Sequence, residues 1–313
     1  MISERDKIAE EGSQLAEVNG IELCYDDFGD PEAETILLVM GLGMQMLAWD
    51  DDFCEMLAMA GFHVVRFDNR DVGLSSKISG RVNVPAGMLG LTGSAVYRLE
   101  DMAADTAGLI EHLGVERVHL VGVSMGGMIS QKLAATQPEL VASLCSIMSS
   151  TGRRRLSTTP RLDALRMLVR SPATTREEAM DSAATIFSVI ASPDFPPDQD
   201  AIRDRAGRAW DRSFHPSGVA RQLMAVLASG DRTRELGRIK APTQVIHGLS
   251  DRLIPVQGGK DTAKAIPGAE LELIKGMGHD LPPALWPRIT ELITTNIARA
   301  EPAPAGSNAG AQA

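Results

Sequence analysis

The stretch His119-Leu120-Val121-Gly122-Val123-Ser124-Met125-Gly126-Gly127-Met128 changes its hydrophobic pattern at Ser124. Apolar and β-branched residues precede the serine, as in a buried parallel strand, and the apolar residues that follow it have helical spacing. Residues 122–126 match the G-x-S-x-G motif, in which a strand turns sharply into a helix and holds the serine in a strained conformation. Flanking glycines let the strand and helix pass closely. The pattern predicts that Ser124 is an exposed nucleophile at a helix N-terminus, where negative charge is favoured.

The rest of the chain alternates predicted strands with predicted helices, which implies an α/β fold with a mostly parallel sheet. Asn19-Gly20 is a favourable hairpin turn between two short strands in residues 14–28. Further strands are expected at 35–40, 63–67, 115–123, 140–148, 243–247 and 270–274, and helices at 53–60, 99–113, 125–137 and 284–298.

The alternation stops between residues 149 and 239. This segment contains no convincing strand, and its prolines separate helical stretches at 162–168, 175–190, 199–209 and 218–227. We therefore expect a core of residues 1–148 and 240–300, a helical cap of 149–239, and a second cover over the site from 77–98. Residues 301–313 are rich in Pro, Ala, Gly and Ser, which is typical of a disordered tail.

Composition narrows the class of protein. A chain of 313 residues that is 44% hydrophobic can bury a large core, and its net charge of −10 argues against a nucleic-acid partner. Cys24, Cys54 and Cys145 lie in apolar or strand-like contexts, so we expect free buried thiols and a reducing, cytoplasmic compartment. We see neither an apolar signal-peptide region near the N-terminus nor an apolar run long enough for a membrane span.

A serine hydroxyl needs a base to take its proton, and in folds with this elbow the acid and then the histidine follow the serine. Three histidines follow Ser124 in the sequence. His215 lies in the expected cap, and His247 ends a strand, where a structural histidine is usual. His279 lies in a glycine-rich loop just after a strand, so we predict that it is the base.

Asp251 is the predicted acid because it lies on the loop that leaves the 243–247 strand. It would accept the Nδ1 proton of His279 and stabilise the imidazolium. A single loop aspartate is usually no more than a solvated side chain, but three loops in the required order favour the triad. Asp280 is the alternative acid, although a sequence neighbour of His279 rarely has the reach to orient its ring.

The predicted oxyanion hole needs two N–H donors. One is the backbone N–H of Met125, and the other is that of Leu42, which lies between Gly41 and Gly43 in the loop after the 35–40 strand. Those glycines could instead form only a tight turn. Several methionines lie in or beside these loops, either as flexible pocket walls or as core fillers: Met40, Met44, Met46, Met125 and Met277. We expect Gly41, Met44 and Met277 to line the substrate pocket.

These motifs together resemble the α/β-hydrolase superfamily, and the resemblance covers residues 21–298. The segments 25–31, 37–41 and 276–279 are similar to those of actinobacterial carboxylesterases related to aclacinomycin methylesterase. The resemblance implies an α/β-hydrolase fold with Ser124, Asp251 and His279 as the triad. Met40-Gly41 replaces the family's usual His-Gly before the oxyanion loop, and a serine nucleophile argues against dehalogenase or epoxide hydrolase activity.

We therefore expect a serine hydrolase that cleaves small apolar carboxylic esters, methyl and short-chain esters among them, through an acyl-enzyme. No metal or organic cofactor is expected. A lactonase or a cofactor-free haloperoxidase or perhydrolase with the same triad is the alternative enzyme. A non-catalytic ligand-binding protein on the same fold is a further alternative, and the sequence leaves the oligomeric state open.

Overall fold

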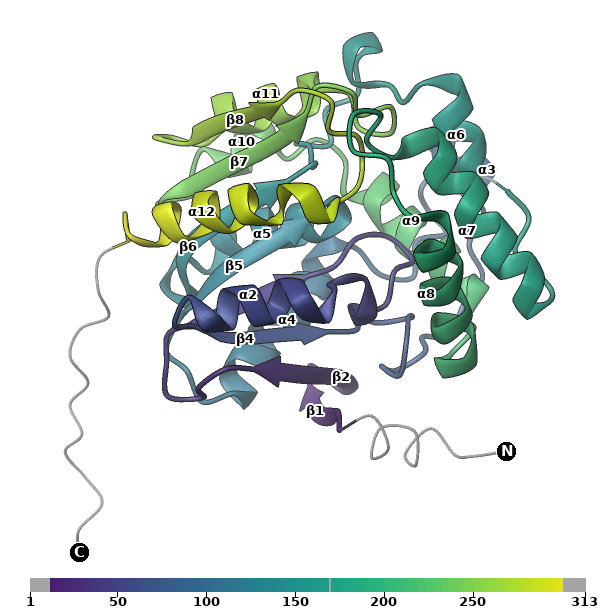
Figure 1. Ribbon diagram of the computed structural model, residues 1–313. Coiled ribbons are helices and arrows are strands. Elements are labelled where there is room, and N and C mark those ends of the chain that lie inside the picture. The colour runs from purple at the N-terminus through teal and green to yellow at the C-terminus, as the bar shows by residue number, and fades with distance from the viewer. Residues whose placement is uncertain (1–11, 169, 301–313) are drawn as a thin grey trace, which may run out of the picture.

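Eight strands form one sheet in the computed structural model, which describes residues 12–168 and 170–300 (Figure 1). Their order across the sheet is β1 (Gln14–Val18), β2 (Ile21–Phe28), β4 (His63–Phe67), β3 (Thr35–Val39), β5 (Val118–Val123), β6 (Val141–Ile147), β7 (Thr243–Gly248) and β8 (Glu270–Ile274). The pairs β1–β2 and β2–β4 are antiparallel, and all other neighbouring pairs are parallel. The predicted α/β class with a mostly parallel sheet is confirmed.

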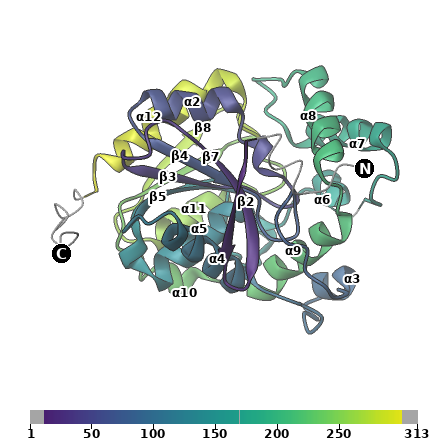
Figure 2. The same ribbon diagram turned by 90° about the horizontal axis from the view of Figure 1, so that it is seen from below.

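Alternate residues of the central strands face two separate cores. Leu37 and Leu120 belong to the core under α4 (Leu99–His112) and α5 (Met125–Thr136), whereas Leu38 and Val121 belong to the core under α2 (Asp51–Met59) and α12 (Trp286–Ile297). Figure 2 shows these two helix layers on opposite faces of the sheet. Both faces are thus covered, which explains why the central strands are apolar throughout.

The chain leaves β3 for β4 on one side and later returns to β5 on the other side of β3. Open α/β sheets bind their ligands at such a switch point, beyond the carboxyl ends of the strands. Residues 40–46 follow β3 and Ser124 follows β5, so both lie at this position. The later loops after β7 and β8 reach the same edge because these strands are parallel to β5.

The described part of residues 149–239 contains helices and no strand. These are a short 3₁₀ turn (Leu156–Thr158), α6 (Leu162–Leu168), α7 (Arg176–Ile190), α8 (Gln199–Arg212), α9 (Pro216–Ser229) and α10 (Thr233–Leu236). Figure 1 shows α6 to α9 gathered beside one end of the strands, together with α3 (Val84–Met88) from the 77–98 segment. The division into core and cap stays a prediction, and the predicted tail at 301–313 lies outside the described residues.

Three α-helices of the described chain were not predicted, α3, α10 and α11, and α11 is the longest of them. Residues Gln257–Ala265 form α11, although two consecutive glycines, Gly258 and Gly259, weaken its helix propensity. A Cβ on Gly259 would lie 2.6 Å from Nδ1 of His247, so glycine is what allows the helix to pack against β7. Tertiary packing therefore outweighs propensity here.

Other local predictions agree with the structure. Asn19 and Gly20 have φ angles of 46° and 76°, as a tight turn between β1 and β2 requires. Cys24, Cys54 and Cys145 are buried, and none of them forms a disulfide with another described residue. None of the helices within 12–168 and 170–300 has the length and the apolar run needed to cross a membrane.

Candidate active site

Ser124 occupies the turn between β5 and α5 with φ 54° and ψ −118°, a conformation that non-glycine residues rarely adopt. The glycines of the motif are sterically required. A Cβ on Gly122 would lie 2.4 Å from the carbonyl oxygen of Gly126, and a Cβ on Gly126 would lie 2.0 Å from that of Val39. The strand and the helix therefore pass closely at the turn, as the motif predicts, and the side chain of Ser124 is held at the start of α5.

Hydrogen bonds connect the side chains of Ser124, His279 and Asp251. Nε2 of His279 lies 3.0 Å from Oγ of Ser124, and Nδ1 of His279 lies 2.7 Å from Oδ2 of Asp251. Oδ1 of Asp251 accepts hydrogen bonds from the backbone N–H groups of Leu253 and Ile254, each at 2.8 Å. Both His279 and Asp251 are buried. Loops after three different strands thus bring together the three residues that the sequence singled out.

The rival groups make their hydrogen bonds elsewhere, although Nε2 of His247 also lies 3.6 Å from Oδ2 of Asp251. His247 donates from Nε2 to the carbonyl oxygen of Ile254 at 2.8 Å, and burial lowers its pKa, as befits a neutral structural histidine. The carboxylate of Asp280 accepts from both the N–H and the hydroxyl of Ser192, at 2.9 and 2.5 Å. Burial raises the pKa of Asp280 and these hydrogen bonds oppose that rise. His215 lies 2.7 Å from the guanidinium of Arg221, on the cap.

The loop after β3 lies directly against Ser124. A Cβ on Gly41 would be 3.3 Å from Cβ of Ser124. The N–H of Leu42 has no hydrogen-bond partner among the described residues. Met125 is the first residue of α5, and its N–H is one of the four that a helix leaves unsatisfied. Both proposed donors are therefore free to bind an oxygen.

Buried side chains hold this loop at both ends. Asn69 donates to the carbonyl oxygen of Met40 at 2.9 Å. Gln222, fully buried on α9, accepts from the N–H of Gly43 and donates to the carbonyl oxygen of Arg70, each at 2.8 Å. Asn69 belongs to the polar turn after β4, which the sequence resemblance includes, but no pattern pointed to Gln222. It lies 179 residues from Gly43 in the chain, so only folding brings them together.

Buried ion pairs join helices α8 and α9 to the polar turn after β4, residues 68–75. Arg212 of α8 pairs with Asp68, and Arg221 of α9 binds both carboxylate oxygens of Asp71, at 2.8 and 2.9 Å. Burial by itself raises the pKa of Asp71, but hydrogen bonds from Arg221, Tyr97 and the Ile78 N–H hold it below its usual value. Helices α8 and α9 are thus fixed to the turn that holds the loop after β3.

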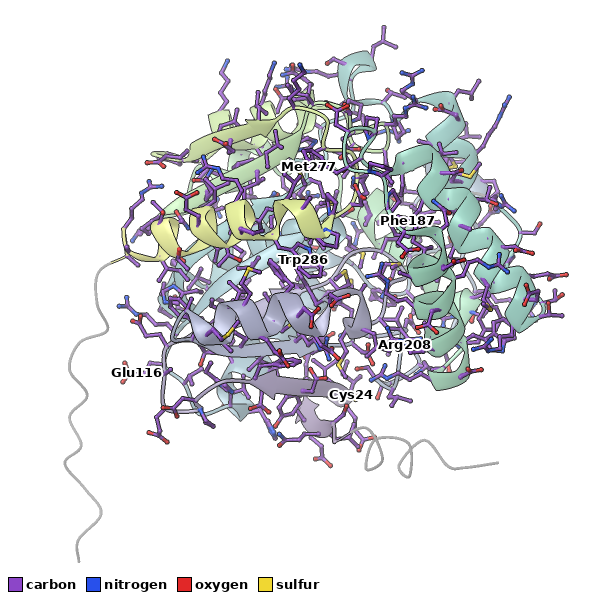
Figure 3. The ribbon with its side chains drawn as sticks, viewed as in Figure 1. Cys24, Glu116, Phe187, Arg208, Met277 and Trp286 are labelled. Carbon is purple, nitrogen blue, oxygen red and sulfur yellow. The ribbon has the colours of Figure 1, made fainter. Side chains whose placement is uncertain are left out.

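A cavity of about 570 Å³ lies between the loop after β3 and helices α7, α8 and α9. Gly43 and Met44 line it on one side, and Phe187 of α7 lines it on the other; Figure 3 shows Phe187 between the cap helices and the sheet. Val84 and Pro85 of the 77–98 segment also line it. Ser124 and His279 do not line this cavity, which touches the loop after β3 at Gly43 and Met44.

The structure places the three residues expected to line the substrate pocket differently, and that expectation stays a prediction. Met44 lines the cavity, but Gly41 lies against Ser124 outside it, and Met277 is fully buried in the core beneath α12. The other methionines near the loops, Met40, Met46 and Met125, are also buried in the cores. Most of these thioether side chains fill gaps in the core, which was the alternative interpretation. In the part of the chain that the structure describes, no group of three or more His, Cys, Asp or Glu side chains could hold a metal ion.

Comparisons with known proteins agree with this fold and identify the family. The model for the alpha/beta hydrolase fold matches residues 34–282. The chain is 29% identical to the rhodomycin D methylesterase DauP of Streptomyces sp. (strain C5), over 85% of this chain and 91% of that protein. A thermophilic esterase from Thermogutta terrifontis superposes with a TM-score of 0.67 at 25% identity, over 90% of this chain and 97% of that one.

The enol-lactonase from Burkholderia xenovorans LB400 superposes with a TM-score of 0.71, over 91% of this chain and all of that one. At 22% identity it supports the fold alone. The resemblance to methylesterases that the sequence motifs predicted is confirmed by the match to the rhodomycin D enzyme. Because the family model covers most of the chain, from β3 to the histidine loop, this protein belongs to the α/β-hydrolase family and is related to bacterial methylesterases.

Proposed function

We propose that this hydrolase cleaves carboxylic esters with Ser124 as nucleophile, His279 as general base and Asp251 as the acid that orients the histidine. The observation that carries the proposal is the hydrogen-bonded line from Asp251 through His279 to Ser124, with distances of 2.7 and 3.0 Å, at a G-x-S-x-G turn. Similarity to a methylesterase supports ester hydrolysis in particular.

In this mechanism, Oγ of Ser124 attacks the ester carbonyl while Nε2 of His279 takes its proton. The N–H groups of Leu42 and Met125 bind the oxyanion, which develops at the positive end of α5. The proton passes from His279 to the departing alcohol, and an acyl-serine remains. Water, activated by the same histidine, then releases the acid. Two hydrogen bonds from backbone N–H groups hold the carboxylate of Asp251 in place toward Nδ1 throughout.

The cavity between the oxyanion loop and the cap is the proposed substrate pocket, and residues 149–239 are the proposed cap. Its volume of about 570 Å³ suits a small to drug-sized ligand. Most of its wall is apolar, so we expect the acyl or alkoxy chain of the substrate to be mainly hydrocarbon or aromatic. Three free buried thiols support a reducing compartment such as the cytoplasm.

The proposal is tested with a panel of methyl, ethyl and p-nitrophenyl esters and of lactones, together with a fluorophosphonate probe. Wild-type protein should hydrolyse esters and be labelled at Ser124, and Ser124→Ala should lose both activity and label. Ser130→Ala, which changes a buried serine on the same helix α5, is the control and should keep both. Turnover of lactones but not open-chain esters would replace the esterase by a lactonase. Absence of both turnover and labelling would favour a binding role.

A further inference from the structure

Helix α8 carries four arginines, and the guanidinium of one of them has no hydrogen-bond or ion-pair partner among the described residues. Three of the four pair with carboxylates: Arg203 with Glu177 and Asp181, Arg208 with Asp204, and Arg212 with Asp68. The guanidinium of Arg205 has no hydrogen bond or ion pair with any residue in 12–168 or 170–300. An unpaired guanidinium on a helix that otherwise pairs its arginines requires an explanation.

Arg205 lines the cavity of about 570 Å³ between the oxyanion loop and the cap. The wall around it is mostly apolar, with contributions from Leu47, Ile186, Phe187, Ala206, Val219 and Leu223. Asp71 is the one acidic residue among the lining residues, and it already accepts hydrogen bonds from Arg221 and Tyr97. Two arginines, Arg170 and Arg205, line the cavity, so it presents positive charge that its own wall does not neutralise.

The surroundings of Arg205 disfavour its charge. Burial lowers the pKa of Arg205, and the nearby Arg208 adds to this effect, whereas Asp50 and Asp280 oppose it through space. Neither carboxylate is within ion-pair distance of Arg205, and that of Asp280 is bonded to Ser192. A guanidinium stays protonated at neutral pH even so. A partly buried charge without a partner costs free energy, and a bound anion would remove that cost.

We propose that Arg205 binds a carboxylate of the substrate, so that the preferred substrates are esters with an apolar chain and one free carboxylate distant from the scissile ester group. This inference rests on the proposed function. The planar guanidinium matches a carboxylate through two parallel hydrogen bonds. Arg170 also lines the cavity, but it is exposed and can be solvated, so it gains less from a bound anion than the half-buried Arg205.

The position of Arg205 gives the substrate an orientation. Met44 lies two residues after Leu42 in the oxyanion loop and lines the same cavity as Arg205. The ester group is thus placed at Ser124 and Leu42, and the carboxylate at α8 on the cap side. The chain that joins them lies among the apolar side chains of α7, α8 and α9. The sequence led us to expect a small apolar ester. The proposal adds one charged group, a carboxylate, at the end of the substrate distant from the ester.

The test compares monomethyl esters of α,ω-dicarboxylic acids with methyl esters of monocarboxylic acids of equal chain length, over a series of chain lengths. At the best length, wild-type protein should prefer the acid-bearing ester in kcat/KM by roughly 10- to 100-fold, mainly through KM, because a charge-assisted hydrogen bond contributes about 1.5–3 kcal/mol. Arg205→Met should bring the ratio close to one, and Arg205→Lys should retain part of it. Arg208→Met, on the same helix, should keep the wild-type ratio.

Thermal unfolding separates substrate binding from a structural role. Arg205→Met should keep or raise the melting temperature, because it removes an unpaired charge, whereas a hidden structural ion pair would make the variant less stable. Equal kcat/KM for the two ester series at every length, or a preference that Arg205→Met retains, would overturn the carboxylate site and leave the esterase intact. A different result would contradict the proposed esterase function. In that case wild-type protein would neither hydrolyse the neutral esters nor react with a fluorophosphonate.

Discussion

Replacement of Asp251 by asparagine tests the proposed division of roles within the triad. One carboxylate oxygen accepts two backbone N–H groups, from Leu253 and Ile254, and the other accepts from Nδ1 of His279. In Asp251→Asn, the amide oxygen must stay with the two N–H donors, because an NH₂ group placed there would face them donor to donor. The NH₂ group therefore faces Nδ1 of His279.

This orientation forces the wrong tautomer on His279. Nδ1 becomes the acceptor, so the ring proton moves to Nε2, which lies 3.0 Å from Oγ of Ser124 and is the atom that must accept the serine proton. The imidazolium also loses its negative partner. We expect kcat to fall by about 10⁴-fold, the loss known for the same substitution in a Ser-His-Asp triad, which corresponds to roughly 5.4 kcal/mol of barrier. The fold should persist because the backbone hydrogen bonds are kept.

Steady-state hydrolysis of a methyl ester measures the loss, and circular dichroism and thermal unfolding check the fold. The matched control is Asp280→Asn, one residue from His279, whose carboxylate is bonded to Ser192 and which should have a far smaller effect. Combining Asp251→Asn with Ser124→Ala should cost much less than the product of the two single losses, since triad members act as a unit. A correctly folded Asp251→Asn with near-normal kcat would refute the assignment, and a large loss in Asp280→Asn would move the acid there.

Three further results are expected. Gln222→Leu leaves the buried N–H of Gly43 and carbonyl of Arg70 unpaired, so kcat should fall by about 10- to 100-fold with less change in KM, while Gln222→Glu, which keeps the acceptor, should recover part of the loss in steady-state assays. Asp71→Asn should lower the free energy of unfolding by about 3 kcal/mol at pH 7 in urea titrations. The pKa of Asp71 is lower in the folded protein than in the unfolded chain, where it is about 3.9. The stabilisation is therefore present above the unfolded pKa and is lost as the pH falls through the folded pKa. The free energies of unfolding of wild type and Asp71→Asn should thus converge below about pH 4. Burial raises the pKa of Cys54 to about 12 and also raises that of Cys145. At pH 8 these thiols should therefore not react with Ellman's reagent in the native protein, but they should react in the unfolded protein. Fast reaction in the native state would contradict their burial.

The sequence by itself determined the features that depend on neighbouring residues. Apolar runs locate the central strands, because a strand buried on both faces is apolar throughout, and alternation and turn residues locate the partly exposed β1 and β8. The G-x-S-x-G pattern located the turn at Ser124, because Gly122 and Gly126 approach each other within the motif itself. Strand order along the chain then placed Asp251 and His279 on loops at the same edge.

Only the tertiary structure decided what lies around these residues. Gln222 reaches Gly43 across 179 residues, Arg221 reaches Asp71 across 150, and α11 forms in spite of its glycines because they let it pack against His247. Arg205 is one of four similar arginines in the sequence of α8, and no periodicity distinguishes it from the other three. It stands apart only when the helix is docked, because docking supplies carboxylates to Arg203 and Arg212, Arg208 pairs with Asp204 of its own helix, and Arg205 is left facing a mostly apolar cavity. Sequence patterns record which residues are apolar at which spacing, whereas partners in space depend on how the packed elements meet.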